Sequence, residues 1–404
     1  MKLVVLGCGA VGSVIARLAQ KLGVASEVAC LDKNVERAKS YLSYPDGGDI
    51  NVEAVDASQV DDLAAKISGF DVVINSLPTF IRVNEKERPL NPLVMQAALK
   101  AGVTYVDLAC YGGKRRSAEQ LSLAKQFRSE GGLALINAGA SPGLTNLLAR
   151  EAYEDFDRAD SVKIMSLEDQ KGTSFLISWS REEMLNVAIP VLVYKEKRYR
   201  VVEPFSEATL CEFPIPTGPV RCYPISNDES YTIPLFLRIN RFAYYAGGSD
   251  IEILRALYRL GVLEEKNIYV RGRPIPLRSL LYQVLREPAS PEDFVRAIEE
   301  GELEDAFFAI KVEVEGEVNG EQAYSSRSVI FPSQRKVNEI SPGATYISYP
   351  TALVALVFAR RILGYRISGV YPPEALPRAV RRGILEDLEK NKILVNLDFH
   401  VKQR

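Results

Sequence analysis

Residues 1–23, MKLVVLGCGAVGSVIARLAQKLG, carry the strongest fold signal in the chain. The apolar run at 2–6 is typical of a buried strand, and Gly7, Gly9 and Gly12 follow it in the spacing G-x-G-x-x-G. Apolar residues at helical intervals come next. A strand, a glycine-rich turn and a helix in this order predict the first phosphate-binding turn of a dinucleotide-binding domain.

An export signal is the rival interpretation of this stretch, because Lys2 precedes an apolar run. No small-residue cleavage site follows, however, and Arg17 and Lys21 continue the helical pattern. The best candidate for a membrane span, 351–359, falls well short of the roughly 20 apolar residues that a span needs. We therefore expect a cytoplasmic protein with no membrane partner.

Each glycine of the turn has a predicted physical role. Gly7 permits the tight turn, Gly9 lets the backbone approach a pyrophosphate, and Gly12 lets the helix pack close to the strand. Ala10 and Val11 lie at the start of that helix, where free N–H groups bind phosphates. These five residues form the predicted cofactor turn.

An acidic residue completes the dinucleotide pattern. Asp32 ends the strand-like EVACLD, 20 residues after Gly12, and is expected to bind the adenosine ribose. A carboxylate repels a 2′-phosphate, so NAD is the expected cofactor. NADP remains the alternative, because Lys33 and Arg37 moderate this repulsion.

Strand-like and helix-like segments alternate through residue 140. Further strands are predicted at 50–56, 70–78, 103–109 and 133–139, and helices at 60–68, 91–102 and 117–130. Six strands with intervening helices predict an α/β fold, a Rossmann doubly wound parallel sheet. Ligands bind at the carboxyl ends of such strands, so Asn75, Ser76 and Leu77 are expected near the nicotinamide.

The central part of the chain predicts a separate α+β unit. Its β-rich stretches are 161–169, 172–180, 190–204, 206–216, 231–247 and 306–332, and its helical ones 249–260, 274–286 and 291–301. We expect a Rossmann domain formed by 1–143 plus 343–404, with 144–342 inserted as a substrate and dimerisation domain.

Several segments resemble the saccharopine dehydrogenase family, most closely its lysine 6-dehydrogenase and carboxynorspermidine dehydrogenase-like branches. They are FDVVINSLP (70–78), GVTYVDLA (102–109), NAGASPGLTNLLA (137–149), SWSREEMLN (178–186), SYPTALVALVFARRILG (348–364) and GVYPPE (369–374). The resemblance implies an inserted α+β domain and a C-terminal helix that returns to the Rossmann domain. It also implies a homodimer that catalyses NAD(P)-dependent chemistry at a carbon–nitrogen bond of a saccharopine- or lysine-like amino acid.

Two departures from the family pattern leave alternatives open. No Gly-Gly-Pro segment precedes SWS, and no histidine occurs near FAYYAGGSD (242–250). A dehydrogenase of another carbon–nitrogen substrate, such as a carboxylated polyamine precursor, is one alternative. A non-catalytic dinucleotide-binding protein is the other.

Proton transfer must proceed almost without histidine, because His400 is the only one. Asp107, Tyr111 and Lys114 follow the fifth predicted strand and are the first catalytic candidates. Glu168 and Asp169 are rivals from the inserted domain. Arg115 or Arg116 is expected to hold a substrate carboxylate.

The segment ASPGLTN (140–146) is a further candidate contact region. Pro142 and Gly143 form a turn expected to lie against the nicotinamide. Thr145 and Asn146 open the next helix, whose N-terminus can bind a substrate carboxylate. The resemblance adds Trp179 and Ser180 as residues lining the substrate cleft.

Composition limits the partners. A net charge of −2 gives no excess of cations for nucleic acid, so a small-molecule amino acid is the expected partner. Five scattered cysteines without a C-x-x-C pair predict buried free thiols and no metal site.

Overall fold

The computed structural model describes residues 1–45, 50–83, 86–112, 116–178, 180–214, 217–264 and 266–401. Its first layer is a seven-stranded parallel sheet in the order β19-β8-β7-β4-β1-β2-β3. The strands are β1 (Lys2–Leu6), β2 (Glu27–Asp32), β3 (Asn51–Ala54), β4 (Val72–Asn75), β7 (Thr104–Asp107), β8 (Leu133–Leu135) and β19 (Gly369–Tyr371). The order reverses between β1 and β4, which confirms the doubly wound prediction.

Helices connect these strands. They are α1 (Gly12–Lys21), α2 (Val35–Leu42), α3 (Val60–Ile67), α4 (Asn91–Ala101) and α5 (Ala124–Ser129). The helix predicted at 117–130 is instead a 3₁₀ turn, Glu119–Leu123, followed by the short α5. Residues of β1 and β4 are almost wholly buried, as expected for strands covered on both faces.

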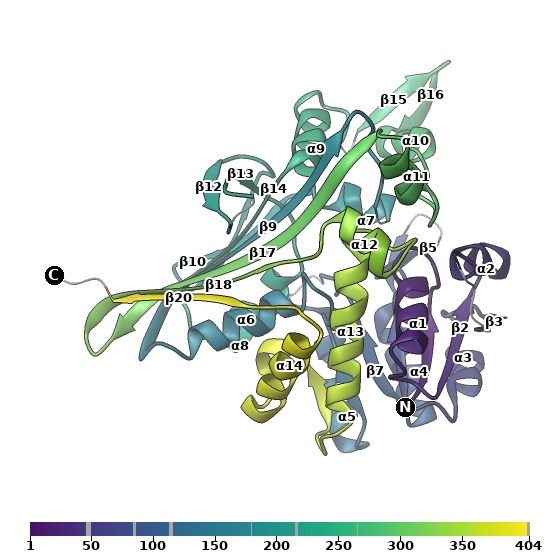
Figure 1. The fold of residues 1–404 in the computed structure, drawn as a ribbon, viewed down its shortest axis with the longest axis horizontal. Coiled ribbons are helices and arrows are strands. Elements are labelled where there is room, and N and C mark those ends of the chain that lie inside the picture. The colour runs from purple at the N-terminus through teal and green to yellow at the C-terminus, as the bar shows by residue number, and fades with distance from the viewer. Residues whose placement is uncertain are drawn as a thin grey trace.

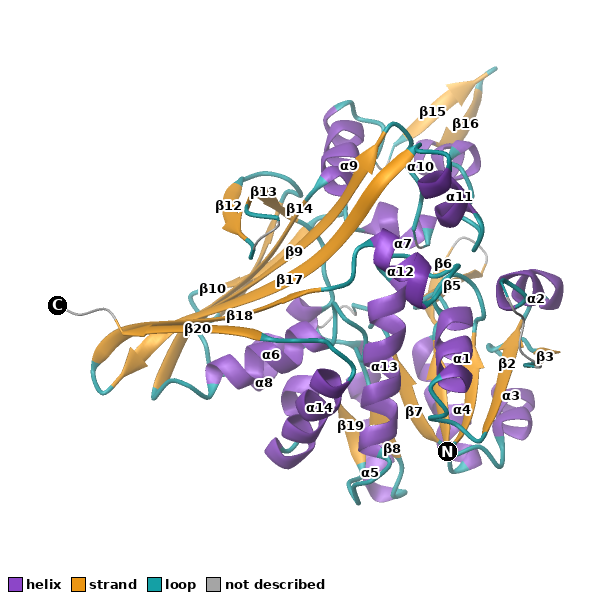
Figure 2. Ribbon diagram, viewed as in Figure 1, coloured by secondary structure: helices purple, strands orange, loops and turns teal. Residues whose placement is uncertain are grey.

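The second layer is a mixed nine-stranded sheet, seen as long twisted strands in Figure 2. Its main path is β11-β10-β14-β9-β17-β18-β20, and β12 and β13 attach beside β14. The strands are β9 (Arg158–Gly172), β10 (Val191–Lys195), β11 (Arg198–Val202), β12 (Thr209–Glu212), β13 (Pro219–Pro224), β14 (Arg241–Gly247), β17 (Leu303–Val318), β18 (Glu321–Ile330) and β20 (Asn396–Val401).

Shorter elements complete this layer. Its helices are α6 (Leu144–Tyr153), α7 (Arg181–Asn186), α8 (Ile233–Phe236), α9 (Ser249–Arg259), α10 (Leu277–Val284), α11 (Asp293–Glu299) and α12 (Gln334–Ile340). Two hairpins lie outside both large sheets: β5 (Phe80–Val83) pairs with β6 (Lys86–Pro89) between β4 and α4, and β15 (Asn267–Val270) pairs with β16 (Arg273–Pro276).

Some predicted strands of this layer are wrong. In the stretch 172–180 only Gly172, the last residue of β9, is in a strand among the described residues, because the chain then turns back onto Gln170. The Gln170 side chain accepts from the Leu176 N–H (3.1 Å) and donates to the Leu176 carbonyl (2.9 Å), replacing a neighbouring strand. The predicted strand 231–247 likewise includes α8, and only its end forms β14. The predicted helix 274–286 begins later than expected, because 274–276 belongs to β16.

The C-terminal part of the chain links both layers. Helix α13 (Ser348–Ile362) packs beside α1 (Figure 1), which confirms the predicted return to the first domain. Strand β19 then joins the first sheet beside β8, and α14 (Arg378–Lys390) packs against α13. Residues 396–401, grouped above with the first domain, pair with β18 as β20.

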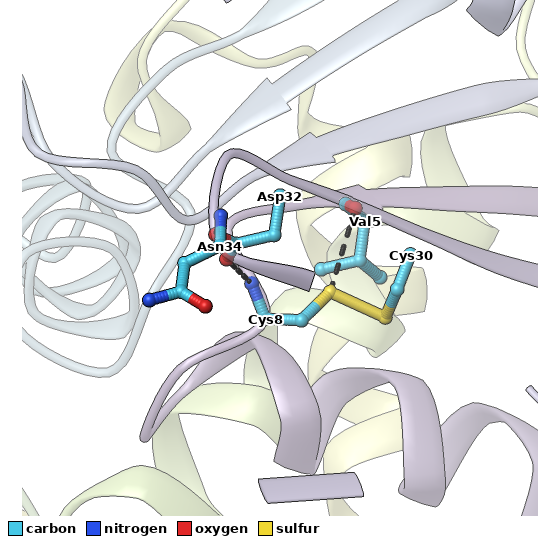
Figure 3. The surroundings of a disulfide bond; sticks show 5 residues. All are labelled: Val5, Cys8, Cys30, Asp32 and Asn34. Atoms are coloured by element: carbon cyan, nitrogen blue, oxygen red, sulfur yellow. Dashed lines mark hydrogen bonds between the residues drawn. A yellow bond between two sulfur atoms is a disulfide. The ribbon is translucent and has the colours of Figure 1, made fainter. Parts of the chain in front are cut away.

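Cys8 and Cys30 form a disulfide, so the expectation that all five thiols are free is wrong (Figure 3). Cys30 lies in β2, and Cys8 comes two residues after β1, its parallel neighbour. The three other cysteines, Cys110, Cys211 and Cys222, are buried and free. Within the part of the chain that the structure describes, no helix combines the length and hydropathy needed to cross a membrane.

Candidate active site

A crevice runs along the carboxyl edge of the first sheet, where the strand order reverses. It consists of three adjoining hollows of about 720, 300 and 310 Å³. Leu77 and Pro78, which follow β4, line all three hollows and join them into one path. A long crevice at this position is where a doubly wound sheet binds an extended dinucleotide.

The glycine turn forms the wall of the middle hollow. Gly7, Gly9, Ala10 and Val11 line it. A Cβ atom at Gly9 would meet no atom within 4 Å, so this backbone is open to a ligand. A Cβ atom at Gly12 would instead overlap the carbonyl oxygen of Gly7, so Gly12 serves close packing and does not line the crevice.

Asp32 lies where the first and middle hollows meet. Its Oδ2 accepts from the Cys8 N–H and its Oδ1 from the Asn34 N–H, each at 2.8 Å (Figure 3). Both hollows include Asp32 in their lining, and the exposed Arg37 lines the middle one. Asp32, the predicted ribose-binding acid, and the cationic Arg37 thus line the same crevice.

The third hollow lies between the two sheets. Its lining includes four carboxyl side chains, Asp107, Glu168, Asp228 and Glu229, together with the hydroxyl-bearing Ser141, Ser180 and Tyr244. No lysine or arginine is among the described residues that line it. We call this hollow the acidic cavity.

Asp107 ends β7 and is the centre of a buried polar network. Its Oδ2 accepts from the hydroxyl of Tyr105 (2.9 Å), from Gln120 (3.0 Å) and from Asn91 (3.3 Å). Its Oδ1 accepts from the Asn137 N–H at 2.7 Å. All these donors are neutral, and burial raises the pKa of Asp107 to about 7.

Asn75 shapes the turn where the hollows meet. Its Oδ1 accepts from the Leu77 N–H (3.2 Å), and its Nδ2 donates to the Tyr105 hydroxyl (3.1 Å). Asn75, Ser76 and Leu77 all line the acidic cavity, and Ser76 and Leu77 also line the middle hollow. The turn predicted for the nicotinamide half is therefore connected to the Asp107 network.

A second network surrounds Glu229. Its Oε1 accepts from the hydroxyls of Thr145 (2.7 Å) and Ser141 (2.9 Å), and Ser141 also bonds to the hydroxyl of Tyr244 (2.9 Å). The Asn146 Oδ1 accepts from the Gly143 N–H at 2.9 Å. Thr145 and Asn146, predicted to contact substrate, are fully buried and bond within the protein.

The other predicted residues are dispersed. Pro142 and Ser180 line the acidic cavity, whereas Gly143 does not. Tyr111 lies outside its lining and donates to Glu87 (3.2 Å), and Arg116 donates to the carbonyl of Tyr199 (3.1 Å). Lys114, Arg115 and Trp179 lie outside the described residues.

Several cavity residues were missed by the sequence reasoning. They are Asn91, Asp228, Glu229 and Tyr244. Asp228 and Glu229 lie at a 3₁₀ turn (Glu229–Tyr231) with no motif to mark them, and Tyr244 occurs in a segment noted above only for its lack of histidine. The described residues contain no group of three His, Cys, Asp or Glu side chains arranged to hold a metal ion.

A doubly wound sheet with this glycine turn, this acidic strand end and a crevice along its carboxyl edge defines a dinucleotide-binding protein. The chain belongs to the saccharopine dehydrogenase family. Residues 3–135 match the saccharopine dehydrogenase NADP binding domain, and residues 139–394 match the saccharopine dehydrogenase C-terminal domain. These matches confirm the predicted family and indicate an NAD(P)-dependent dehydrogenase.

Solved structures share the fold. The chain is similar to saccharopine dehydrogenase (L-Glu forming) from Saccharomyces cerevisiae, with a TM-score of 0.67 and 13% identity over 99% of each chain. The TM-score is 0.43 with the DAP dehydrogenase of C. glutamicum, at 12% identity over 97% of this chain and 99% of that one. It is 0.42 with a meso-DAP dehydrogenase variant from Clostridium tetani, at 10% identity over 96% and 98%.

Proposed function

We propose that the protein oxidises or reduces the CH–NH or CH–NH₂ group of a saccharopine- or lysine-like amino acid. The observation that carries this proposal is the path from the glycine turn into the acidic cavity. A cofactor lying along that path brings its nicotinamide to the cavity mouth at Leu77 and Pro78. When bound, the nicotinamide supplies the hydride acceptor or donor.

The cofactor contacts are assigned from the crevice lining. The turn Gly7–Val11 faces the pyrophosphate, and the start of α1 offers its N–H groups. Asp32 accepts from the adenosine ribose, and its negative charge favours NAD over NADP. Asn75, Ser76, Leu77 and Pro142 border the nicotinamide half.

The proton-transfer assignment rests on position. Asp107 lines the cavity and carries a pKa of about 7, which suits proton exchange near neutrality. Tyr111 lies apart from the cavity, so its predicted role has less support. Ser180 and Tyr244 supply hydroxyls that can orient the substrate.

A non-catalytic role would be supported by a cavity blocked with apolar side chains. The cavity instead has a volume of about 310 Å³ and four carboxyl groups in its lining. An open cavity lined by carboxyl groups favours a catalytic role over a non-catalytic one. A carboxylated polyamine precursor remains the alternative substrate, because a cationic chain suits such a lining.

We also propose a cytoplasmic homodimer that pairs through the second sheet. Strand β20 is an edge of that sheet, and its Leu397, Phe399 and Val401 are exposed. Exposed edge strands are common pairing surfaces. Light scattering on the purified protein should give twice the mass of one chain, and the mass of one chain would contradict the dimer.

Turnover is tested by following absorbance at 340 nm. The protein is incubated with NAD⁺ or NADP⁺ and lysine, saccharopine or a carboxylated polyamine, and the reverse reactions are run with reduced cofactor. We expect a signal with at least one amino acid and a higher kcat/KM with NAD⁺. No signal in either direction with any of them would contradict the proposed function.

A further inference from the structure

Glu168 reaches the acidic cavity from the second sheet. It lies on β9, next to Phe308 of β17 in the strand register. Side chains alternate between the faces of a strand, so Glu168 shares a face with Ser166 and not with Leu167. Leu167 packs into the small apolar cluster on the far face, whereas Glu168 lines the cavity.

The carboxyl group of Glu168 has no partner among the described residues. It forms no hydrogen bond or ion pair with any of them, in contrast to Asp107 with its four donors and Glu229 with its two. A carboxylate has about four acceptor positions, so Asp107 is nearly saturated. Of these three carboxyl groups, Glu168 therefore has the largest unused acceptor capacity for a ligand.

Among the described residues, the groups around Glu168 are acidic or neutral. Asp250 at the start of α9 is the nearby charge that acts on it, and Tyr346 is a further neighbour. Across the cavity lie Asp107, Asp228, Glu229 and Tyr244. Burial and the charge of Asp250 raise the pKa of Glu168 to about 8. A cation entering the cavity would lower the free-energy cost of ionising Glu168, whereas an anion would raise that cost.

We propose that Glu168 binds and deprotonates the ammonium group of the substrate, so that the cavity accepts a substrate end carrying an amine and rejects one carrying a carboxylate. This inference rests on the proposed function and narrows its substrate class. The relevant end is an amine on an alkyl chain without an adjacent carboxylate. In this inference Glu168 takes the proton in place of Asp107, and Asp107 acts as a positioning residue for the turn at Asn75.

The proton and electron balance is complete without another reagent. The ammonium N–H bond breaks, its proton goes to a Glu168 oxygen, and its electron pair stays on nitrogen. The neighbouring C–H bond then breaks with its electron pair, which leaves as hydride to the oxidised cofactor. The nitrogen lone pair forms the C=N bond, so the substrate loses two electrons and the cofactor gains them.

Binding is tested with two probes of equal length and opposite charge, 1,5-diaminopentane and glutarate. Reduced cofactor is kept saturating, so that the diamine cannot react, and binding is followed by calorimetry. We expect the diamine to bind and glutarate not to bind. Diamine affinity should rise more than about tenfold between pH 6 and pH 8, because Glu168 must lose its proton before it pairs with the cation.

The variants separate a chemical role from a structural one. Glu168→Gln should lower diamine affinity at pH 8 at least about tenfold and flatten the pH dependence. Glu168→Asp should keep part of the diamine affinity and part of its pH dependence. Glu304→Gln, an exposed change elsewhere on the same sheet, is the matched control and should alter neither. Cofactor affinity and melting temperature verify that each variant is folded.

The outcomes distinguish this inference from the proposed function. Diamine binding that depends on Glu168 supports the inference even if no amino acid is oxidised. Glutarate binding as tightly as the diamine would overturn it, and so would an unchanged pH profile in Glu168→Gln. Oxidation of saccharopine in preference to lysine would overturn it while leaving the proposed function intact.

Discussion

The hydroxyl of Tyr105 donates a 2.9 Å hydrogen bond to Oδ2 of Asp107, two residues further along the same strand. Both side chains therefore lie on one face of β7, the face towards the turn at Asn75. Tyr105 also accepts from Asn75, so a carboxylate at the sheet edge holds the turn that borders the nicotinamide half.

Asp107→Asn should disrupt this network. An amide in place of Oδ2 would direct its N–H groups at donors on Gln120 and Asn91, leaving buried donors unpaired. We expect a loss of about 1–3 kcal/mol in the free energy of unfolding and a larger drop in kcat than in cofactor affinity. Denaturant melts and steady-state kinetics measure both. An unchanged melt would contradict the network described here.

The stability of the protein without cofactor should depend on pH. Burial raises the pKa of Asp107 to about 7 and of Glu168 to about 8, above their values in the unfolded chain. Their contribution to stability is therefore complete below about pH 4 and is lost as the pH rises through 7 and 8. In Glu168→Gln the free energy of unfolding should fall less steeply as the pH approaches 8. A wild-type curve parallel to that of the variant would count against the raised pKa.

Two glycine variants should separate binding from packing. In Gly9→Ala the new methyl group enters open crevice, so folding should persist while cofactor affinity falls about tenfold or more. In Gly12→Ala it meets the Gly7 carbonyl, which should cost about 1–3 kcal/mol of stability. Fluorescence titration with NADH and thermal melts measure the two effects. The reverse pattern would show that Gly9 does not face the pyrophosphate.

The Cys8–Cys30 disulfide encloses a segment with a sequence separation of 22. Replacing both cysteines with serine should lower the free energy of unfolding by roughly 3 kcal/mol, because the unfolded chain regains its freedom. Thiol titration under denaturing conditions should show three free thiols in the oxidised protein. Five reactive thiols before any reductant is added would refute the bond.

Cofactor preference should depend on the charge of Asp32. Asp32→Asn removes the charge that repels a 2′-phosphate while Arg37 stays in the crevice lining. The ratio of kcat/KM for NADP⁺ over NAD⁺ should therefore rise by about tenfold or more. Asp61→Asn on the exposed part of α3 is the charge-matched control. Equal ratios in both variants would remove Asp32 from the ribose site.

Local patterns predicted most of the first sheet, because each of its strands was followed by a turn and a helix in one stretch of chain. They missed α2, and they missed β19 because it joins β8 from far along the chain, outside the local alternation of strands and helices. The disulfide was missed because only the pairing of β1 with β2 brings Cys8 near Cys30.

Site residues could be predicted where a local sequence pattern marks them, and not where the fold brings them in from a distant part of the chain. Asp107 and Asn75 end strands of the first sheet, and that position alone predicts proximity to a ligand. Glu229 reaches Thr145 from a turn far along the chain, and no sequence period encodes such a contact. Thr145 and Asn146 were expected to face substrate, but their hydroxyl and amide groups serve buried partners.

The position of β19 has a consequence for biosynthesis. This strand completes the first sheet beside β8, and α13 covers α1, yet both are made only after every strand of the second sheet except β20. A nascent chain ending near residue 143 would leave apolar residues of α1 and β8 uncovered. The N-terminal layer can therefore reach its final state only after residues 348–371 have been made, and until then its uncovered apolar surface is a site for aggregation.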